Sequence, residues 1–259
     1  MNKRFIEKLG VEGLSRRIVL ERLIVGTAAV FLGCRRGPRL GQPAASLASP
    51  ATAHAAVIPS CVARPEQTEG PYFIDEKLNR SDIRSDPSDG SVKQGVTLRL
   101  AFHVSRVNGA SCSSLSNAIV DIWQCDALGI YSDVRDVNAG FDTRGRKFLR
   151  GYQITDPNGI AEFLTIYPGW YPGRTVHIHF KIRSESSSRR GLEFTSQLYF
   201  DESITDEVHK RTPYNSKGRR STTNDTDFSF RRGGKQLIPS LAKDGQGYAA
   251  KFEIGLQMS

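Results

Sequence analysis

The sequence predicts an all-β fold, a single antiparallel β-sandwich domain with long loops, preceded by a disordered or helical export signal. Residues 96–104 alternate between apolar and polar side chains, which is the period of a half-buried strand. Short segments of this kind recur between turn residues from Pro59 onward. No window of comparable length outside the N-terminal leader has an apolar period of 3.6 residues. Many short strands at roughly even spacing favour a sandwich or a barrel.

The N-terminal leader is typical of an export signal. The apolar run Leu23–Leu32 follows the paired residues Arg16 and Arg17 and is too short to span a bilayer. A basic segment before a short apolar run is the secretory pattern, and the paired arginines resemble the twin-arginine type. We therefore expect residues 1–56 to form a signal with an Ala-, Pro- and Ser-rich tether, residues 57–259 to form the domain, and the protein to be periplasmic or extracellular.

Two sites are candidates for cleavage of the leader, and an uncleaved amphipathic anchor is the alternative to both. The residues before Cys34 loosely resemble a lipoprotein box, which would place a lipid anchor on Cys34 and tether the protein to a membrane. Ala53-His54-Ala55 fits the small-x-small cleavage pattern. Beyond the leader remain Cys61, Cys112 and Cys125, an odd number that names no disulfide pair. None of them has the CxxC spacing of a zinc ribbon.

The positive charge lies mostly in the leader. The chain has 36 basic and 27 acidic residues, of which residues 1–56 hold nine and three, leaving 27 and 24 in the rest. A domain so nearly balanced does not indicate a polyanion partner, and nucleic acid is not expected as a ligand.

The remaining strands are predicted from β-forming segments bounded by turn residues. Asp156-Pro157-Asn158-Gly159 is a strong turn signal that predicts a hairpin between Phe148–Thr155 and Ile160–Ile166. By contrast, residues 201–234 are polar and irregular, as expected of a loop that is either functional or mobile. No internal repeat or second linker is visible, so we predict one domain; the sequence does not indicate its oligomeric state. The full set of expected strands is Val96–Val104, Ala118–Trp123, Phe148–Thr155, Ile160–Ile166, Thr175–Arg183, Phe194–Phe200 and Tyr248–Leu256.

His177 and His179 form an HxH pattern on one of the predicted strands. Residues two apart on a strand share a face, so both imidazoles point the same way and make a ready pair of metal ligands. The pattern names no metal by itself, because zinc, copper and iron sites all use it. No Cys, Asp or Glu stands immediately beside it.

Tyrosines stand near the histidine pair instead. Tyr167 and Tyr171 precede it in Tyr167–Arg174, and Tyr131 follows the end of another predicted strand. A tyrosinate oxygen is a hard anionic donor that favours a ferric ion, and tyrosine is known as a ligand of haem iron. Two tyrosinates and two histidines would give a ferric site with room for a further ligand.

Several motifs, in order, resemble the intradiol ring-cleavage dioxygenases, the family of catechol 1,2-dioxygenase and protocatechuate 3,4-dioxygenase. The similarity extends from about Cys61 to Phe200. It is carried by Thr68–Tyr72, Val120–Ser132, Gly151–Tyr152 with Asp156–Gly159, Thr165–Pro172, and Arg174 with His177–Phe180.

The resemblance implies Fe(3+) as the cofactor, held by Tyr131, Tyr171, His177 and His179. Tyr167 is the rival for the second tyrosine, and Tyr171 is preferred because it lies in the Pro-Gly-x-Tyr-Pro context. The resemblance also implies a charge-stabilising role for Arg174 and a hydrogen-bonding role for Gln197. These two residues and Tyr171 are the predicted catalytic residues.

The function implied is intradiol cleavage of a catechol-type diol by O2 to a muconate-type dicarboxylate. Two alternatives use the same fold. One is a sandwich hydrolase or copper oxidase that uses only His177 and His179. The other is an exported, non-catalytic module that binds a metal or another ligand, since fold alone does not determine function.

Overall fold

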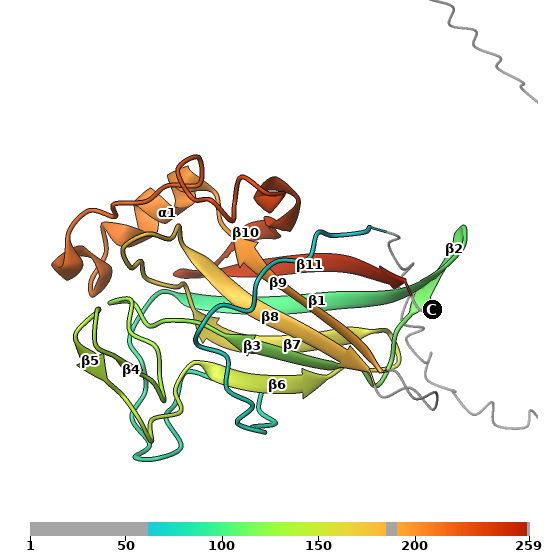
Figure 1. Ribbon diagram of the computed structural model, residues 1–259, viewed down its shortest axis with the longest axis horizontal. Coiled ribbons are helices and arrows are strands. Elements are labelled where there is room, and N and C mark those ends of the chain that lie inside the picture. Colours follow the sequence, from blue (N-terminus) through green and yellow to red (C-terminus); the bar gives the residue numbers. More distant parts are fainter. Residues whose placement is uncertain (1–61, 185–190, 258–259) are drawn as a thin grey trace, which may run out of the picture. The chain divides into compact units, whose positions relative to one another are not determined.

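The computed structural model describes residues 62–184 and 191–257, and these residues form two β-sheets and a small two-stranded ribbon (Figure 1). The predicted export signal, the tether, Cys34 and Cys61 lie outside the described residues. The first sheet contains β10 (Ser240–Asp244), β11 (Gly247–Gln257), β1 (Thr97–Asn108) and β2 (Ser111–Ser114), with β7 (Ile160–Ile166) paired to β1. The second contains β6 (Arg150–Ile154), β3 (Ile119–Trp123), β8 (His177–Ser184) and β9 (Leu192–Tyr199). The ribbon is β4 (Arg135–Asp136) with β5 (Phe141–Asp142).

The two sheets pack face to face, which confirms the predicted sandwich. The apolar residues of the alternating segment are all buried: Val96, Leu98, Leu100, Phe102 and Val104. The Phe102 ring of β1 packs against the Phe180 ring of β8, with the ring centroids 5.2 Å apart. It also contacts Phe163 of β7 and Phe252 of β11. Aromatic side chains of both sheets therefore meet in one core.

Two details of the strand pairing differ from the prediction. The predicted hairpin is wrong: β6 pairs with β3, whereas β7 pairs with β1 in the other sheet. The turn itself is present, because the Asp156 carbonyl accepts a hydrogen bond from Gly159 N at 2.9 Å. Here the chain crosses from one sheet to the other. In addition, β1 and β11 run parallel, with Leu98 opposite Tyr248, so the first sheet is not wholly antiparallel.

The polar segment after Phe200 is more regular than predicted. It contains the helix α1 (Glu202–His209) and the 3-10 helices η1 (Tyr214–Lys217) and η2 (Gly234–Leu237). Asp201 caps α1, since its side chain accepts a hydrogen bond from Ser203 N at 2.8 Å. The segment is therefore not irregular throughout, as the sequence had indicated. α1 spans only eight residues, which is shorter than the window over which a helical apolar period is normally read from a sequence.

The described cysteines have different states. Cys112 is disulfide-bonded, and Cys125 is a buried free thiol. Among the residues that the structure describes, no helix is long and apolar enough to cross a membrane.

Candidate metal centre

His177 and His179 lie side by side at the start of β8. Both side chains are buried, and their Nε2 atoms are 3.1 Å apart. On the opposite face of the strand, Val176, Ile178 and Phe180 belong to the main core. The strand therefore presents two imidazoles in one direction, as the HxH pattern predicts.

Tyr171 approaches the histidine pair from the preceding turn. Pro172 and Gly173 form this turn, in which Gly173 has a φ of +85° and Tyr171 bridges to Arg174. A positive φ of this kind favours glycine. The Tyr171 hydroxyl lies 3.1 Å from His177 Nε2.

Tyr131 approaches from a different loop, after β3. The Asp126 carboxylate shapes that loop by accepting hydrogen bonds from the backbone N atoms of Leu128 and Ile130, at 2.9 and 3.0 Å. The Tyr131 ring lies 5.8 Å from the Tyr171 ring and 6.4 Å from the His179 ring, between centroids. All four predicted ligands thus converge from three separate segments.

The histidines are held as neutral bases. His177 Nδ1 lies 2.6 Å from the Thr175 carbonyl oxygen, which can only accept, so Nδ1 carries the proton and the Nε2 lone pair is available. Burial lowers the pKa of His177 to about 3, and the Arg174 guanidinium acts in the same direction. Burial also lowers the pKa of His179 well below its usual value. A metal prefers imidazoles in this neutral state.

Burial keeps both tyrosines in the neutral phenol form, even though the Arg174 guanidinium lowers the pKa of each. Burial raises the pKa of Tyr131 well above its usual value, with a further contribution from the nearby Tyr171. Burial raises the pKa of Tyr171 as well, although Arg174 opposes the shift. Moreover, the buried Tyr131 hydroxyl has no hydrogen-bond partner among the described residues. An unpaired buried hydroxyl is costly, so this oxygen is a candidate for contact with a cation.

This donor set fits a ferric ion. Two neutral imidazoles and two phenols lie together here, and a cation of high charge is the kind that displaces protons from buried phenols. Among residues 62–184 and 191–257, no three His, Cys, Asp or Glu side chains gather as a metal site. The side chains that lie beside the His177/His179 pair and could add oxygen ligands are therefore those of Tyr131 and Tyr171.

Arg174 is fixed beside these four residues by a network of buried groups. Its Nε donates to the Asp227 carboxylate at 2.9 Å, and its Nη2 donates to Gln197 Oε1 at 2.5 Å. Gln197 in turn donates to the Thr68 carbonyl at 2.8 Å and accepts a hydrogen bond from the Tyr199 hydroxyl at 3.0 Å. Both predicted non-ligand residues, Arg174 and Gln197, are therefore beside the site, and Gln197 contacts Arg174 directly.

Asp227 belongs to the site but was not predicted from the sequence. Its side chain is fully buried and also accepts hydrogen bonds from the backbone N atoms of Thr175 and Phe230. It lies in the polar segment 201–234, far along the chain from Arg174. The length of that loop was the only signal of a functional role.

Two further aromatic residues support the ligands. The Trp123 ring stacks on His179 at 5.0 Å between centroids, almost parallel. The Tyr72 ring stacks on Tyr131 at 4.5 Å, and its hydroxyl donates to Asp136 of β4. Gly70 permits close approach to His179, because a Cβ at that position would lie 3.1 Å from the imidazole Cε1.

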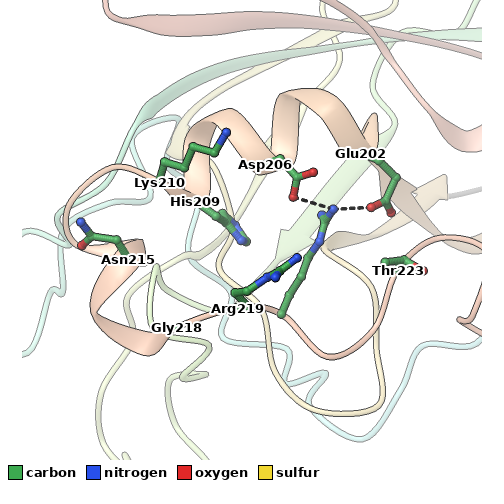
Figure 2. A pocket seen from close by; sticks show the side chains of 9 residues that line it. Glu202, Asp206, His209, Lys210, Asn215, Gly218, Arg219 and Thr223 are labelled. Atoms are coloured by element: carbon green, nitrogen blue, oxygen red, sulfur yellow. Dashed lines mark hydrogen bonds and ion pairs between the residues drawn. The ribbon is translucent and has the colours of Figure 1, made fainter.

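Tyr167 and His209 lie outside the centre. Tyr167 is buried in the main core, where its hydroxyl hydrogen-bonds to the Thr205 hydroxyl at 2.7 Å. Tyr171, and not Tyr167, is therefore the tyrosine beside the histidine pair. His209 borders a separate hollow of about 740 Å³ beside α1, in which Arg220 pairs with Glu202 and Asp206 (Figure 2).

Comparisons with known proteins show the family to which this domain belongs. A family model described as Dioxygenase (Dioxygenase_C) matches residues 68–223, which include every predicted site residue. The protocatechuate 3,4-dioxygenase beta chain of Burkholderia cepacia is 32% identical over 139 residues, 50% of this chain and 56% of that protein. Catechol 1,2-dioxygenase 1 of Acinetobacter lwoffii is 24% identical over 153 residues, 50% of this chain and 45% of that protein. The chain thus spans about half the length of these two relatives.

A solved structure matches over a larger share. The intradiol ring-cleavage dioxygenase from Tetranychus urticae is 33% identical and superposes with a TM-score of 0.65. The match covers 76% of this chain and 95% of that structure. The described domain therefore corresponds to nearly all of that structure.

Proposed function

Because this chain belongs to the intradiol ring-cleavage dioxygenase family, we propose that it is a non-haem Fe(III) dioxygenase acting on a catechol-type diol. Both atoms of O2 would enter the substrate, and the carbon–carbon bond between the two hydroxyl-bearing carbons would break. Each of these carbons becomes a carboxyl carbon, so the product is a muconate-type dicarboxylate. Diol and O2 together supply every atom and electron, and no external reductant is needed.

The observation that carries this proposal is the convergence of Tyr131, Tyr171, His177 and His179. We propose that these four side chains hold the ferric ion. A hydrolase or copper oxidase that used only the histidines would leave the two buried phenols beside them without a role. No described feature favours a non-catalytic module over the enzyme.

When bound, the ferric ion would bind the diol and withdraw electron density from its ring, which makes the ring reactive toward O2. Among the protein groups, Tyr171 is the one we expect the diol to displace. Its turn is partly exposed, whereas Tyr131 is fully buried. Once displaced, the Tyr171 phenolate oxygen would accept a proton from the substrate, which is general-base catalysis.

Arg174 would stabilise the negative charge that develops on the ring oxygens. Its guanidinium is permanently charged, and it is oriented before the substrate arrives. Gln197 would act mainly through Arg174, because its side-chain oxygen accepts from the guanidinium.

The proposal is tested on the purified full chain after ferric loading. We expect one iron per chain, a red-brown tyrosinate-to-iron absorption band, and O2 uptake with catechol. Product spectra and mass should show a six-carbon dicarboxylate with two added oxygen atoms. Colourless, iron-free protein after loading would refute the proposal, as would cleavage outside the two hydroxyl-bearing carbons.

Two tyrosines of one short segment provide a matched pair of variants. We expect Tyr171→Phe to shift the absorption band and to lower kcat at least about 100-fold, because a ligand that also serves as general base is lost. Tyr167→Phe removes a buried hydroxyl of the core, so it should leave the band in place and cost about 1 kcal/mol of stability. Equal bands and rates for the two variants would show that Tyr171 is not a ligand.

A further inference from the structure

Lys217, the last residue of η1, joins the two loops that carry Tyr131 and Tyr171. Its ammonium group donates a hydrogen bond to the Leu128 carbonyl, three residues before Tyr131. The same ammonium lies over the Trp170 ring, 5.0 Å from its centroid and one residue before Tyr171. A single cation therefore contacts both tyrosine loops.

The two loops meet at Gly129, directly beneath this ammonium. A Cβ on Gly129 would lie 2.2 Å from the Trp170 carbonyl oxygen and 2.5 Å from Lys217 Nζ, and the residue has a φ of +81°. Only glycine allows the loops to pack backbone against backbone here. Lys217 therefore binds where the two loops are already in direct contact.

The 3-10 helix η1, which carries Lys217, is itself held in place by Tyr214. Tyr214, at the other end of η1, is buried, and its hydroxyl donates to the Tyr167 carbonyl at 2.7 Å. The same hydroxyl accepts a hydrogen bond from Val96 N at 2.9 Å. η1 is therefore anchored both to the segment that leads to Tyr171 and to the residue before β1.

Lys217 has no carboxylate partner among the described residues, unlike most of the half-buried cations. The nearest acid in the loop, Asp126, pairs with Lys93 at 2.9 Å. The contacts of the Lys217 ammonium are a carbonyl and an aromatic face, one from each tyrosine loop. An ammonium over a Trp ring is attracted to it, more strongly where water is partly excluded.

We infer that Lys217 is a positioning residue, which sets the placement of Tyr131 relative to Tyr171 by holding their two loops together. The inference rests on the proposed function, because these tyrosines are the proposed iron ligands. The effect on the iron site would be indirect, since Lys217 touches neither phenol. Residues that orient metal ligands in this way commonly change metal affinity or activity by about 10- to 100-fold when removed.

The test compares Lys217→Met, Lys217→Arg and Lys243→Met with the wild-type chain. Methionine keeps the unbranched shape and most of the length of the side chain but loses the charge and the donor, whereas arginine can still donate and stack on Trp170. Lys243 is the matched control, because its ammonium also lies over a ring, that of Tyr248 at 4.5 Å, with no contact to either tyrosine loop. Thermal unfolding of each variant establishes that it is folded.

Two measurements are made on these proteins. In the metal-free state, hydrogen exchange at the backbone amides of residues 129–131 and 169–171 should be at least about 10-fold faster in Lys217→Met. In the ferric-loaded state, the same variant should bind iron about 10-fold more weakly and show a shifted tyrosinate-to-iron band. Lys217→Arg should restore most of both properties, and Lys243→Met should match the wild type.

Unchanged exchange in metal-free Lys217→Met would overturn the inference, whatever the iron result. Failure of the wild type to bind iron would refute the proposed function instead, while the exchange data would still decide whether Lys217 holds the loops together. Faster exchange with an unshifted band and unchanged iron affinity would show that the loops are joined without setting the ligands, which also overturns the inference.

Discussion

Asp227 determines how Arg174 is presented to the candidate metal centre. The carboxylate accepts from the guanidinium Nε and from two backbone N atoms while fully buried. The Asp227 carboxylate therefore stabilises the turn before β8 and orients the Arg174 guanidinium at the same time. Its several donors, together with the nearby Arg174, hold the pKa of Asp227 below its usual value even though burial opposes this. It therefore stays ionised at neutral pH.

We predict that Asp227→Asn lowers kcat by about 10-fold with a smaller effect on KM, because Arg174 loses its fixed charge partner. The loss of stability should be about 1–3 kcal/mol, as a buried charge-assisted network is weakened. Steady-state kinetics and chemical unfolding measure the two effects. Asp244→Asn is the control, since Asp244 forms an exposed pair with Arg99 and such pairs contribute about 0–1 kcal/mol. Equal losses in the two variants would contradict the prediction.

At the level of single residues, the sequence allowed the four candidate ligands, Arg174 and Gln197 to be proposed, but not the residues that hold them in place. His177 and His179 are two apart on a strand, so their common direction follows from local geometry alone. Tyr131 and Tyr171 were assigned through resemblance, because nothing local distinguishes a tyrosine ligand from a packed tyrosine such as Tyr167. Asp227 and Lys217 could not be found in this way, since their contacts depend on how distant loops fold over the sheet.

At the level of elements, strand positions were predictable and strand partners were not. The alternation of residues 96–104 reports which side chains are buried, and β1 buries that set. The alternation carries no information on which strand pairs with β1. For that reason the turn at residues 156–159 was predictable, while its role as a crossing between sheets was not. β4 and β5 have two residues each, too few for any period to appear, and α1 is shorter than the window over which a helical period is normally read.

α1 ends at His209, which ties the helix to the segment leading to Tyr171. His209 Nε2 hydrogen-bonds to the Pro168 carbonyl at 3.1 Å, and its ring stacks on Tyr214. Burial lowers the pKa of His209, and the Arg220 guanidinium acts in the same direction. As the pH falls below about 6.5, His209 takes up a proton in the unfolded chain but stays neutral in the folded chain. The contribution of His209 to the free energy of unfolding is therefore fully present above that pH and is lost as the pH falls below it.

We predict that His209→Gln makes the metal-free protein less sensitive to pH between about 6.5 and 5. Glutamine does not titrate, so one proton fewer is taken up on unfolding. The slope of the unfolding free energy against pH should fall by up to about 1.4 kcal/mol per pH unit. Urea unfolding at several pH values measures this slope. The other histidines contribute equally to the slope in the variant and in the wild type, so the difference reports His209 alone. Parallel slopes for the variant and the wild type would rule out this role for His209.

At the level of the whole molecule, Phe102 lies where the sheets meet, in contact with aromatic residues of β7, β8 and β11. We predict that Phe102→Ala destabilises the domain by about 3–5 kcal/mol, because it opens a cavity between the sheets. Phe228→Ala is the control: Phe228 is 65% exposed, and its removal should change stability by less than about 0.5 kcal/mol. Guanidinium unfolding measures both. A small effect at Phe102 would mean that the sheets do not depend on this contact.

The parallel pairing of β1 with β11 has a consequence for synthesis. β1 is the central strand of its sheet, yet the partner on one side of it, Gly247–Gln257, leaves the ribosome last among the described strands. Until then, the backbone donors and acceptors along that side of β1 have no neighbour, and such an open edge invites pairing with other chains. A nascent chain that stalls before Gly247 should therefore be a target for chaperones, and a truncated one should aggregate.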